Sequence, residues 1–419
     1  MTSVMMEQLV VARPTRWNAA QVRRVARVLN GGTPSSDPEN WDGDIPFVTP
    51  PDLRGRAGDI VATTGRKLTA VGATSGSTVA DAGVVVSNRA PIGYVGRLDA
   101  PSAFNQGCKV LRPDAQLQER YLAYCMVAVA PVLQELGQGT TFMELSSQSL
   151  GSLYVPLPPL AEQRAIADYL DRETAKIDAL IEKQTKLIDR LRERRSTFTA
   201  HIIEKEQPFR VNGPRLRHHV RGVRQGWSPQ CNNWPAETDE WAVLRAGCTN
   251  RGVFDPYDNK QLPEGTEPRP DTVVRDGDLV VGRANTRDLV GGAAVVRGTY
   301  PRLMLSDKLY AYCLRGGALP EYVAAVLGTQ RYRDMIGLAA TGASYSMQNI
   351  CQRDIADLPM SLPSLEVQVA CVKQIDDETA RIDALIAKSE RFIELARERR
   401  SALITAAVTG QIDVTEGAA

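Results

Sequence analysis

The feature that most constrains this chain is a long internal repeat. Residues 157–196 align without a gap with residues 362–401, at a constant offset of 205 residues, and 21 of the 40 aligned positions are identical. The segments ETAKIDALI (173–181) and ETARIDALI (378–386), followed in each copy by RERRS, carry much of the identity. A repeat of this kind indicates that one structural unit is used twice. The length of 419 residues, about twice the offset, agrees with that interpretation.

Both copies of the repeat predict long helices. Residues 160–206 and 365–408 contain no proline or glycine, and good helix formers dominate both segments. Apolar residues recur at spacings of three, four and seven, which is typical of the buried seam of a coiled coil. The predicted seam residues are Leu170, Ile177, Ile181, Ile188 and Leu191 in the first copy, and Ile375, Ile382, Ile386 and Ile393 in the second.

Polar residues interrupt the two seams at matched positions. Gln184 and Arg195 stand in the first seam, and Ser389 and Arg400 occupy the equivalent places in the second. Polar seam residues set register and partner choice, so we expect the two helices to pair with each other. Because the first helix must carry the chain on to a second module, we expect the pair to be antiparallel with a pseudo-twofold axis.

The segments outside the helices are rich in Gly and Pro, with short apolar runs typical of strands. GVVVSNRAPIGYVGRL (83–98) parallels GDLVVGRANTRDLVGGAAVV (277–296), and apolar helices are expected at 119–136 and 320–338. We predict an α+β fold class in which two α/β modules are separated by two long antiparallel coiled-coil helices. The predicted boundaries are 1–155 for the first module, 156–205 for the central helix, 206–360 for the second module, 361–412 for the distal helix and 413–419 for a C-terminal tail.

Composition narrows the class of protein. The chain carries 50 Lys and Arg against 49 Asp and Glu, which excludes a histone-like polycation and at first sight argues against a nucleic-acid partner. The longest uncharged apolar stretch, 121–134, is too short for a membrane span, and the N-terminus lacks a signal peptide, so we expect a cytoplasmic protein. The seven cysteines show no zinc or disulfide spacing, and each is expected to be a buried small hydrophobe.

Taken together, the motifs resemble a known family, the specificity subunit of type I restriction-modification systems. The resemblance covers nearly the whole chain and rests on GGTPSSDPENWDGDIPFVTPPDL (31–53), PIGYVG, NQGCK, the LPPL-x-EQ entry to the first helix and the two helical repeats. It implies that the modules are target-recognition domains, each reading one half of a split, asymmetric DNA site. It also implies that the helices space the modules and dock two methyltransferase subunits.

This sequence departs from the family pattern in two places. The second helix is entered through LPSLEVQ (362–368) instead of LPPL-x-EQ, and the second module opens differently from the first. Base-contact roles are therefore not transferred from one module to the other.

The resemblance also implies partners and cofactors. Double-stranded DNA and two methyltransferase subunits are the expected partners, with restriction subunits as a further candidate and no membrane. S-adenosylmethionine is expected on the methyltransferase, and ATP and Mg on the restriction subunit, with no cofactor in this chain.

The residues themselves also favour a non-catalytic subunit. The sequence has no G-x-x-x-x-G-K-[ST] loop, and Asp255-Pro256-Tyr257 lacks the second proline of a D-P-P-Y methyltransferase loop and is interpreted as a turn. Asp276 and Asp278 are not followed by the acidic-x-Lys pair that would complete a nuclease site. No residues at metal-ligand spacing point to a metal site.

Positive charge is local in this chain, and DNA binding needs such charge to neutralise phosphates. No segment is strongly basic overall, but residues 83–112 and 283–315 each carry an excess of Arg and Lys, which suit guanine edges and phosphates. The candidate DNA-binding residues are Arg54, Arg89, Arg97, Lys109, Arg112, Arg283, Arg287, Arg302 and Lys308. The alternative is that these are solvated loop charges, and the basic stretch 205–225 is equally consistent with phosphate contacts and with a solvated linker.

Two other classes of function stay open at this point. A coiled-coil scaffold with two protein-binding heads would need no basic faces, and its binding would be insensitive to salt. A self-sufficient methyltransferase would need the cofactor loop that the sequence lacks. For the specificity subunit, helices of about 60 Å would act as a ruler between half-sites about 34 Å apart.

Overall fold

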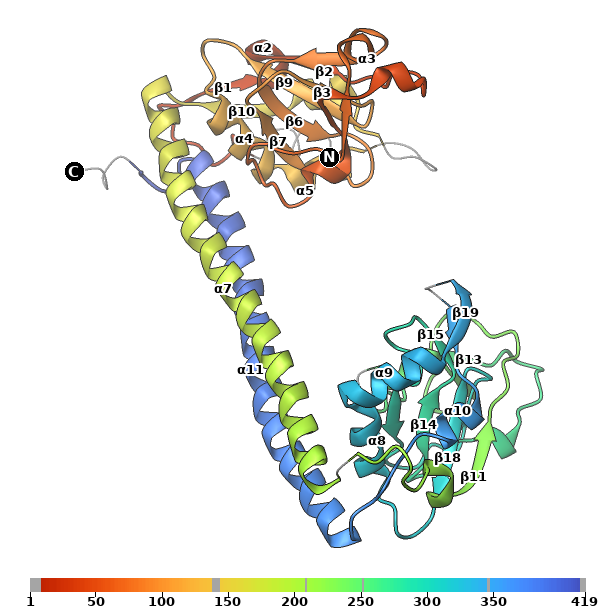
Figure 1. Cartoon of the computed structure of the whole chain (residues 1–419). Coiled ribbons are helices and arrows are strands. Elements are labelled where there is room, and N and C mark those ends of the chain that lie inside the picture. The colour runs from red at the N-terminus through yellow and green to blue at the C-terminus, as the bar shows by residue number, and fades with distance from the viewer. Residues whose placement is uncertain (1–8, 138–143, 208, 251, 345–346, 415–419) are drawn as a thin grey trace. The chain divides into compact units, whose positions relative to one another are not determined.

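The computed structural model describes residues 9–137, 144–207, 209–250, 252–344 and 347–414. The chain divides into two compact units (Figure 1). Unit 1 comprises residues 1–185 and 391–419, and unit 2 comprises residues 186–390. Most of the predicted C-terminal tail, residues 415–419, lies outside the described residues.

The first module of unit 1 is built from short strands with helices between them. Its elements are β1 (Asn18–Gln21), α2 (Val22–Val25), β2 (Ala26–Asn30), η1 (Pro38–Asn40), β3 (Trp41–Val48), η2 (Pro50–Leu53), β4 (Arg66–Leu68), α3 (Ala70–Thr74), β5 (Thr78–Ala80), β6 (Gly83–Ser87), β7 (Val95–Leu98), β8 (Ser102–Phe104), β9 (Cys108–Pro113), α4 (Glu119–Ala128), α5 (Ala130–Glu135), α6 (Ser147–Ser152) and β10 (Tyr154–Leu157).

Two four-stranded sheets form this module, in the orders β2-β9-β6-β7 and β4-β3-β8-β5, and β1 pairs with β10. Strand β6 is buried on both faces, because Val84 and Val86 enter the core under α4 while Val85 enters a second core with Phe104. The predicted helix 119–136 is divided into α4 and α5. The division falls next to Pro131, which lacks the N–H that a helix interior requires.

The second module, in unit 2, repeats this plan. Its elements are η3 (Leu216–His219), β11 (Val220–Gln225), β12 (Ala242–Leu244), η4 (Ala246–Thr249), β13 (Asn259–Gln261), η5 (Pro270–Thr272), β14 (Leu279–Gly282), β15 (Ala284–Asn285), β16 (Ala293–Val295), β17 (Leu303–Met304), β18 (Leu309–Leu314), α8 (Pro320–Gly328), α9 (Gln330–Ala339), β19 (Thr341–Ser344), β20 (Met347–Asn349) and α10 (Gln352–Ala356).

The two modules share one sheet topology. The order β11-β18-β14-β16 in the second module matches β2-β9-β6-β7 in the first, strand by strand along the chain. In the smaller sheets, β12 pairs antiparallel with β13 and parallel with β17, as β3 does with β4 and β8. The predicted helix 320–338 is also divided, since α8 ends at Gly328 and Thr329 is extended.

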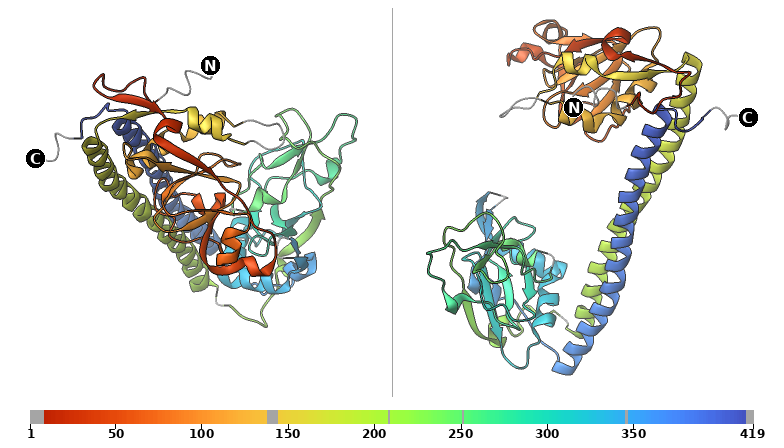
Figure 2. Two further views of the ribbon diagram at one scale, coloured as in Figure 1. Left: turned by 90° about the horizontal axis from the view of Figure 1, so that it is seen from above. Right: turned by 180° about the vertical axis from the view of Figure 1, so that it is seen from behind.

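The long helices are α7 (Leu160–Glu206) and α11 (Leu365–Val408), with the bounds that the absence of Pro and Gly predicted. They lie side by side in Figures 1 and 2 and run antiparallel. In unit 2, the partner of Arg192 is Glu390, whereas Arg194, further along α7, contacts Glu378, further back in α11. Together with the structural comparisons below, these contacts confirm the predicted fold class.

The C-terminal end of α11 belongs to the core of unit 1. Ile404, Ala407 and Val408 are buried in the same cluster as Leu9 and Trp17, and the hydroxyl of Tyr121 donates a hydrogen bond of 3.1 Å to the Val408 carbonyl. Segments from both ends of the chain therefore complete one core.

Four cysteines are buried as expected and Cys231 and Cys313 are partly buried, but the prediction was wrong for Cys351, which is exposed. This residue precedes α10, where its Sγ contacts the carboxylate of Asp354. Among the described residues, no helix combines the length and apolar character needed to cross a membrane.

Candidate nucleic-acid interface and partner surface

Two seam arginines hold the long helices in register, one in each unit. In unit 1, Nε of Arg400 donates to both carboxylate oxygens of Asp178, at 3.0 and 3.1 Å. In unit 2, Nε of Arg195 lies 3.3 Å from the Asp383 carboxylate. The two arginines are 205 residues apart, and so are the two aspartates. The ion pairs are therefore equivalent, and charged groups at seam positions favour this antiparallel register over others.

The predicted seam residues lie where the two helices pack or where each helix meets its module. Ile181 and Ile386 are partly buried, and the others are buried: Leu170, Ile177, Ile188, Leu191, Ile375, Ile382 and Ile393. Among the polar interruptions, Ser389 is buried, while Gln184, Arg195 and Arg400 are partly buried.

Large apolar side chains are also exposed on these helices, and the sequence analysis missed them. In unit 1, Leu180 is 47% exposed and Phe392 is 41% exposed; in unit 2, Leu187 is 42% and Leu385 is 49% exposed. Leu180 corresponds to Leu385 and Leu187 to Phe392 at the 205-residue offset. Each residue directly precedes a predicted seam residue, so applying the offset to apolar residues beside the seam would have found them. Each unit presents one residue of each of these two matched pairs, and Leu160, Leu365, Val369 and Leu395 are further exposed apolar residues of the long helices.

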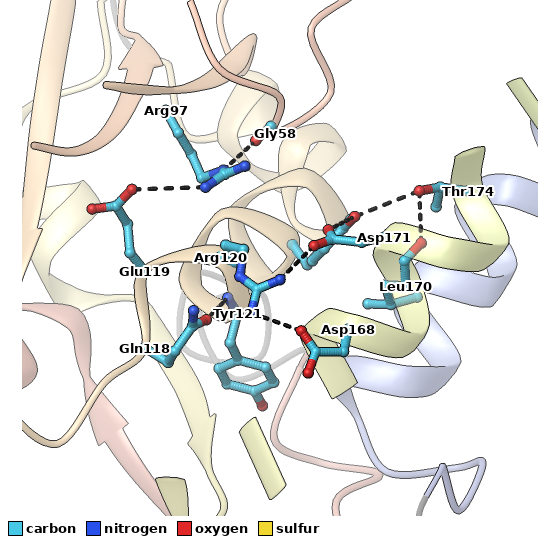
Figure 3. A network of polar contacts seen from close by, with 11 residues as sticks. Gly58, Arg97, Gln118, Glu119, Arg120, Tyr121, Asp168, Leu170, Asp171 and Thr174 are labelled. Carbon is cyan, nitrogen blue, oxygen red and sulfur yellow. Dashed lines mark hydrogen bonds and ion pairs between the residues drawn. The ribbon is translucent and has the colours of Figure 1, made fainter. Parts of the chain in front are cut away.

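Unit 1 fastens its module to α7 through a polar network (Figure 3). Arg120 of α4 contacts Asp168 at 2.7 Å and Asp171 at 2.6 Å, and the Tyr124 hydroxyl donates to Asp171 at 2.7 Å. Burial is the main reason that the pKa of Tyr124 is raised. This network joins the module's first long helix to the start of α7.

Three of the candidate DNA-binding residues in the first module already have partners within the protein. Nε of Arg97 donates to the Gly58 carbonyl at 2.9 Å, and its guanidinium lies 4.0 Å from Glu119 (Figure 3). Lys109 is buried, donates to Asn30 Oδ1 at 2.7 Å, and has its pKa lowered mainly by that burial. Arg89, which is half-exposed, forms an ion pair of 3.0 Å with Glu144. Arg54 and Arg112 are exposed.

In the second module, three of the four candidates face solvent. Arg287, Arg302 and Lys308 are exposed, whereas Arg283 is partly buried and donates to the Asp307 carbonyl at 3.2 Å. Arg297, which lies in the same basic segment, forms an ion pair with Glu321 in the first turn of α8. This contact matches that of Arg97 with Glu119 in the first turn of α4.

The basic stretch 205–225 makes contacts within unit 2. Arg215 donates to the Asp357 carbonyl at 2.7 Å, and Arg217 pairs with the Asp357 carboxylate. Arg224 pairs with buried Asp278, which also accepts a hydrogen bond of 2.7 Å from the Arg275 backbone N–H. Asp278 therefore has a structural ion pair.

Two basic residues that the sequence analysis did not single out lie on β4 in the first module. Arg66 and Lys67 are exposed, and the Arg66 guanidinium lies 3.4 Å from the centre of the Trp41 ring. They are neighbours in the chain, but they lie outside the two basic segments used for the prediction. Their signal was an Arg-Lys pair in a strand of three residues, which is too short to recognise by periodicity.

The described ranges contain no group of three or more His, Cys, Asp or Glu placed to hold a metal ion. Asp255 accepts a hydrogen bond of 3.0 Å from the Tyr257 backbone N–H, in the turn interpreted from the sequence.

Comparisons with known proteins agree with these features. Residues 14–190 match the family model of the type I restriction modification DNA specificity domain. The EcoEI specificity subunit of Escherichia coli is 28% identical over 182 residues, 42% of this chain and 31% of the relative. The MjaIX specificity subunit of Methanocaldococcus jannaschii is 32% identical over 178 residues, 41% of this chain and 40% of the relative. The chain thus aligns with less than half the length of each of these two relatives.

The fold has a close match among solved structures. A chain from a structure described as the "structural basis underlying complex assembly and conformational transition of the type I R-M system" superposes with a TM-score of 0.70. The match covers 96% of this chain and 99% of the other, at 15% sequence identity. This likeness concerns the fold.

Proposed function

The chain belongs to the specificity-subunit family of type I restriction-modification systems, and from this premise we propose that it recognises a two-part DNA sequence and docks methyltransferase subunits. The proposal rests on one observation: the two modules share one sheet topology but have different surfaces. Lys109 is buried in the first module, for example, whereas the basic residue Lys308 of the second is exposed. Two modules with different surfaces would bind two different half-site sequences, so the target would be asymmetric.

The DNA contacts follow from charge and exposure. Cationic side chains that reach solvent can neutralise phosphates or reach base edges, and buried or internally paired ones are less available. We therefore propose that the first contacts are made by the exposed candidates Arg54, Arg112, Arg287, Arg302 and Lys308, together with Lys67. Arg97, Lys109 and Arg283 act instead by stabilising the modules.

The partner surface follows from the exposed apolar residues of the long helices. Leu180 with Phe392 in unit 1, and Leu385 with Leu187 in unit 2, are equivalent pairs. Burial of such side chains drives association, and equivalent surfaces accept identical partners. Two copies of one methyltransferase subunit, one on each pair, fit this repetition.

In this proposal, methylation and restriction are catalysed by the partner subunits. In this proposal S-adenosylmethionine is bound by the methyltransferase subunits, and ATP and Mg by restriction subunits where these are present. This chain contributes binding and spacing and is not itself an enzyme.

Co-expression of the whole chain with a type I methyltransferase subunit tests the DNA-reading proposal. Sequencing of methylated adenines should show one split, asymmetric motif with a fixed spacer. Insertion of seven residues into both α7 and α11, about 10 Å, should lengthen the spacer by about three base pairs. Methylation without a split motif, or binding of the modules to protein ligands with no dependence on salt, would favour the scaffold alternative.

Native mass spectrometry of the complex tests the docking surface. The double variant Leu180→Glu with Phe392→Glu should remove one methyltransferase copy, and Leu187→Glu with Leu385→Glu should remove one as well. Gln374→Glu, an exposed change on α11, should leave both copies bound. Retention of two copies by both double variants would rule out these residues as the docking surface.

A further inference from the structure

Two buried glutamines occupy the same place at the start of the two long helices. Gln163 lies in the first turn of α7 and Gln368 in the first turn of α11, and they are 205 residues apart. Each is 0% exposed. A buried amide must find partners for its oxygen and its N–H groups, because a lost hydrogen bond is costly away from water.

In unit 1, Gln163 joins α7 to the loop that precedes α4. Its Nε2 donates to the carbonyls of Gln116, at 2.9 Å, and Pro158, at 2.8 Å. Its Oε1 accepts a hydrogen bond of 2.8 Å from the backbone N–H of Gln118. Gln118 in turn caps α4, since its side chain accepts a hydrogen bond from the backbone N–H of Tyr121 (Figure 3).

In unit 2, Gln368 makes the same three hydrogen bonds. Its Nε2 donates to the carbonyls of Gly317, at 2.9 Å, and Pro363, at 2.8 Å. Its Oε1 accepts from the backbone N–H of Leu319, at 2.8 Å, and Leu319 is the residue that precedes α8. The loop before each module's helix is thus tied to the start of a long helix by one amide.

All six partner groups belong to the backbone, so the contact does not depend on the side chains that differ between the modules. A glutamine amide offers two donors and an acceptor in one plane, whereas methionine offers none of these and glutamate lacks the donors when ionised. The pair is therefore a common attachment for two otherwise divergent modules.

We infer that Gln163 and Gln368 are positioning residues that fix each module on its long helix and thereby set the spacing between the two half-sites. This inference rests on the proposed function. It assigns the glutamines to the geometry of recognition, while the exposed residues of the modules read the bases.

The test measures spacer length and half-site sequence separately. Gln163→Met and Gln368→Met, made singly in the full chain and co-expressed with the methyltransferase, keep the side-chain volume and remove the three hydrogen bonds. We expect unchanged half-site sequences, but a spacer that spreads over two or more lengths in the methylated-adenine map. Gln374→Met, an exposed change on α11, should keep the single wild-type spacer.

Hydrogen exchange gives a second readout on the same proteins. Peptides that contain the Gln118 or Leu319 amide should exchange faster in the corresponding variant, while β6 and β14 stay protected. If a methionine variant loses protection throughout its module, Gln163→Glu or Gln368→Glu, which keeps an acceptor for that amide, replaces it in the spacer test. A single wild-type spacer in a folded variant, or an altered half-site sequence, would overturn the inference. A wild-type chain without any split motif would instead refute the proposed function.

Discussion

The two units attach their modules to the long helices in different ways. Unit 1 uses the charged network of Arg120 with Asp168 and Asp171, to which Tyr124 adds a hydrogen bond. The hydrogen bonds of the two glutamines equate Gln118 with Leu319, so unit 2 has Glu321 and Ala325 at the positions equivalent to Arg120 and Tyr124.

Both units bury a tyrosine at this place, Tyr121 in unit 1 and Tyr322 in unit 2, and unit 2 adds further aromatic packing. Tyr322 and Tyr332 are buried against Ile375 and Cys371 of α11, and Phe209 packs edge-on against Tyr332. The glutamine attachment and an Arg–Glu pair in the first turn of the module's helix are common to both units. The two modules therefore differ in the side chains that attach them to the long helices, as they do on their other surfaces. The hydrogen bonds between the glutamines and backbone groups are the same in both units.

The largest expected effect comes from the equivalent core residues of the two attachments. Leu170 is buried in the core of unit 1, and Ile375, at the equivalent position, is buried in that of unit 2. Leu170→Ala should lower the free energy of unfolding of unit 1 by about 2–5 kcal/mol, because it leaves a cavity. Ile375→Ala should have a similar effect on unit 2. Hydrogen exchange resolved by unit measures both, and equal losses in both units from one variant would show that the units unfold together.

The next largest effect is expected at alkaline pH, where the stabilities of the two units should differ. Burial raises the pKa of four tyrosines in unit 2, Tyr310, Tyr312, Tyr322 and Tyr332, and the pKa of Tyr332 rises to about 12. In unit 1, burial raises the pKa of Tyr121 and Tyr124. A raised tyrosine pKa contributes stability that is present below the unfolded value, near 10, and is lost as the pH rises through the folded value. Each such tyrosine adds a slope of about 1.4 kcal/mol per pH unit in that window.

Unit 2 should therefore lose protection from hydrogen exchange first when the pH is raised above 10. Tyr332→Phe should make its pH dependence shallower, and Tyr94→Phe, at a residue of the first module, is the matched control. An earlier loss of protection in unit 1 would contradict the comparison.

The smallest expected effect is that of the charged network. Arg120→Met should destabilise unit 1 by about 1 kcal/mol, since the ion pairs are partly exposed. The loss should shrink in 1 M salt, where screening already weakens the pairs. Arg172→Met, at an exposed position of α7, is the control. A loss that does not depend on salt would indicate that the packing of the Arg120 side chain matters more than its charge.

The order of modules and long helices could be predicted from the sequence, because the local spacing of apolar residues identifies each long helix. The bounds of α7 and α11 followed from the absence of Pro and Gly, and the matched seam residues Arg195 and Arg400 predicted that the helices pair. The constant offset of 205 residues between the two helical segments indicated that one unit is used twice.

The candidate interface was less accessible to sequence reasoning, because the availability of a charge depends on tertiary contacts. Arg97 and Arg112 look alike in the sequence, yet one contacts Gly58 and Glu119 and the other is exposed. Lys109 lies on a strand whose neighbours bury it beside Asn30. The exposure of Leu180 could not be predicted, because Leu180 and Ile181 fall in the same apolar stripe of the sequence.

The core of unit 1 has a consequence for the order of synthesis. Ile404, Ala407 and Val408, among the last described residues of the chain, complete a cluster that also contains Leu9 and Trp17. Proteins are made from the N-terminus, and domains generally begin to fold as they emerge from the ribosome. Unit 2 consists of one continuous segment and can close during translation. The first module to be synthesised is thus finished after the second, and part of its apolar core stays uncovered until residues 404–408 have been made.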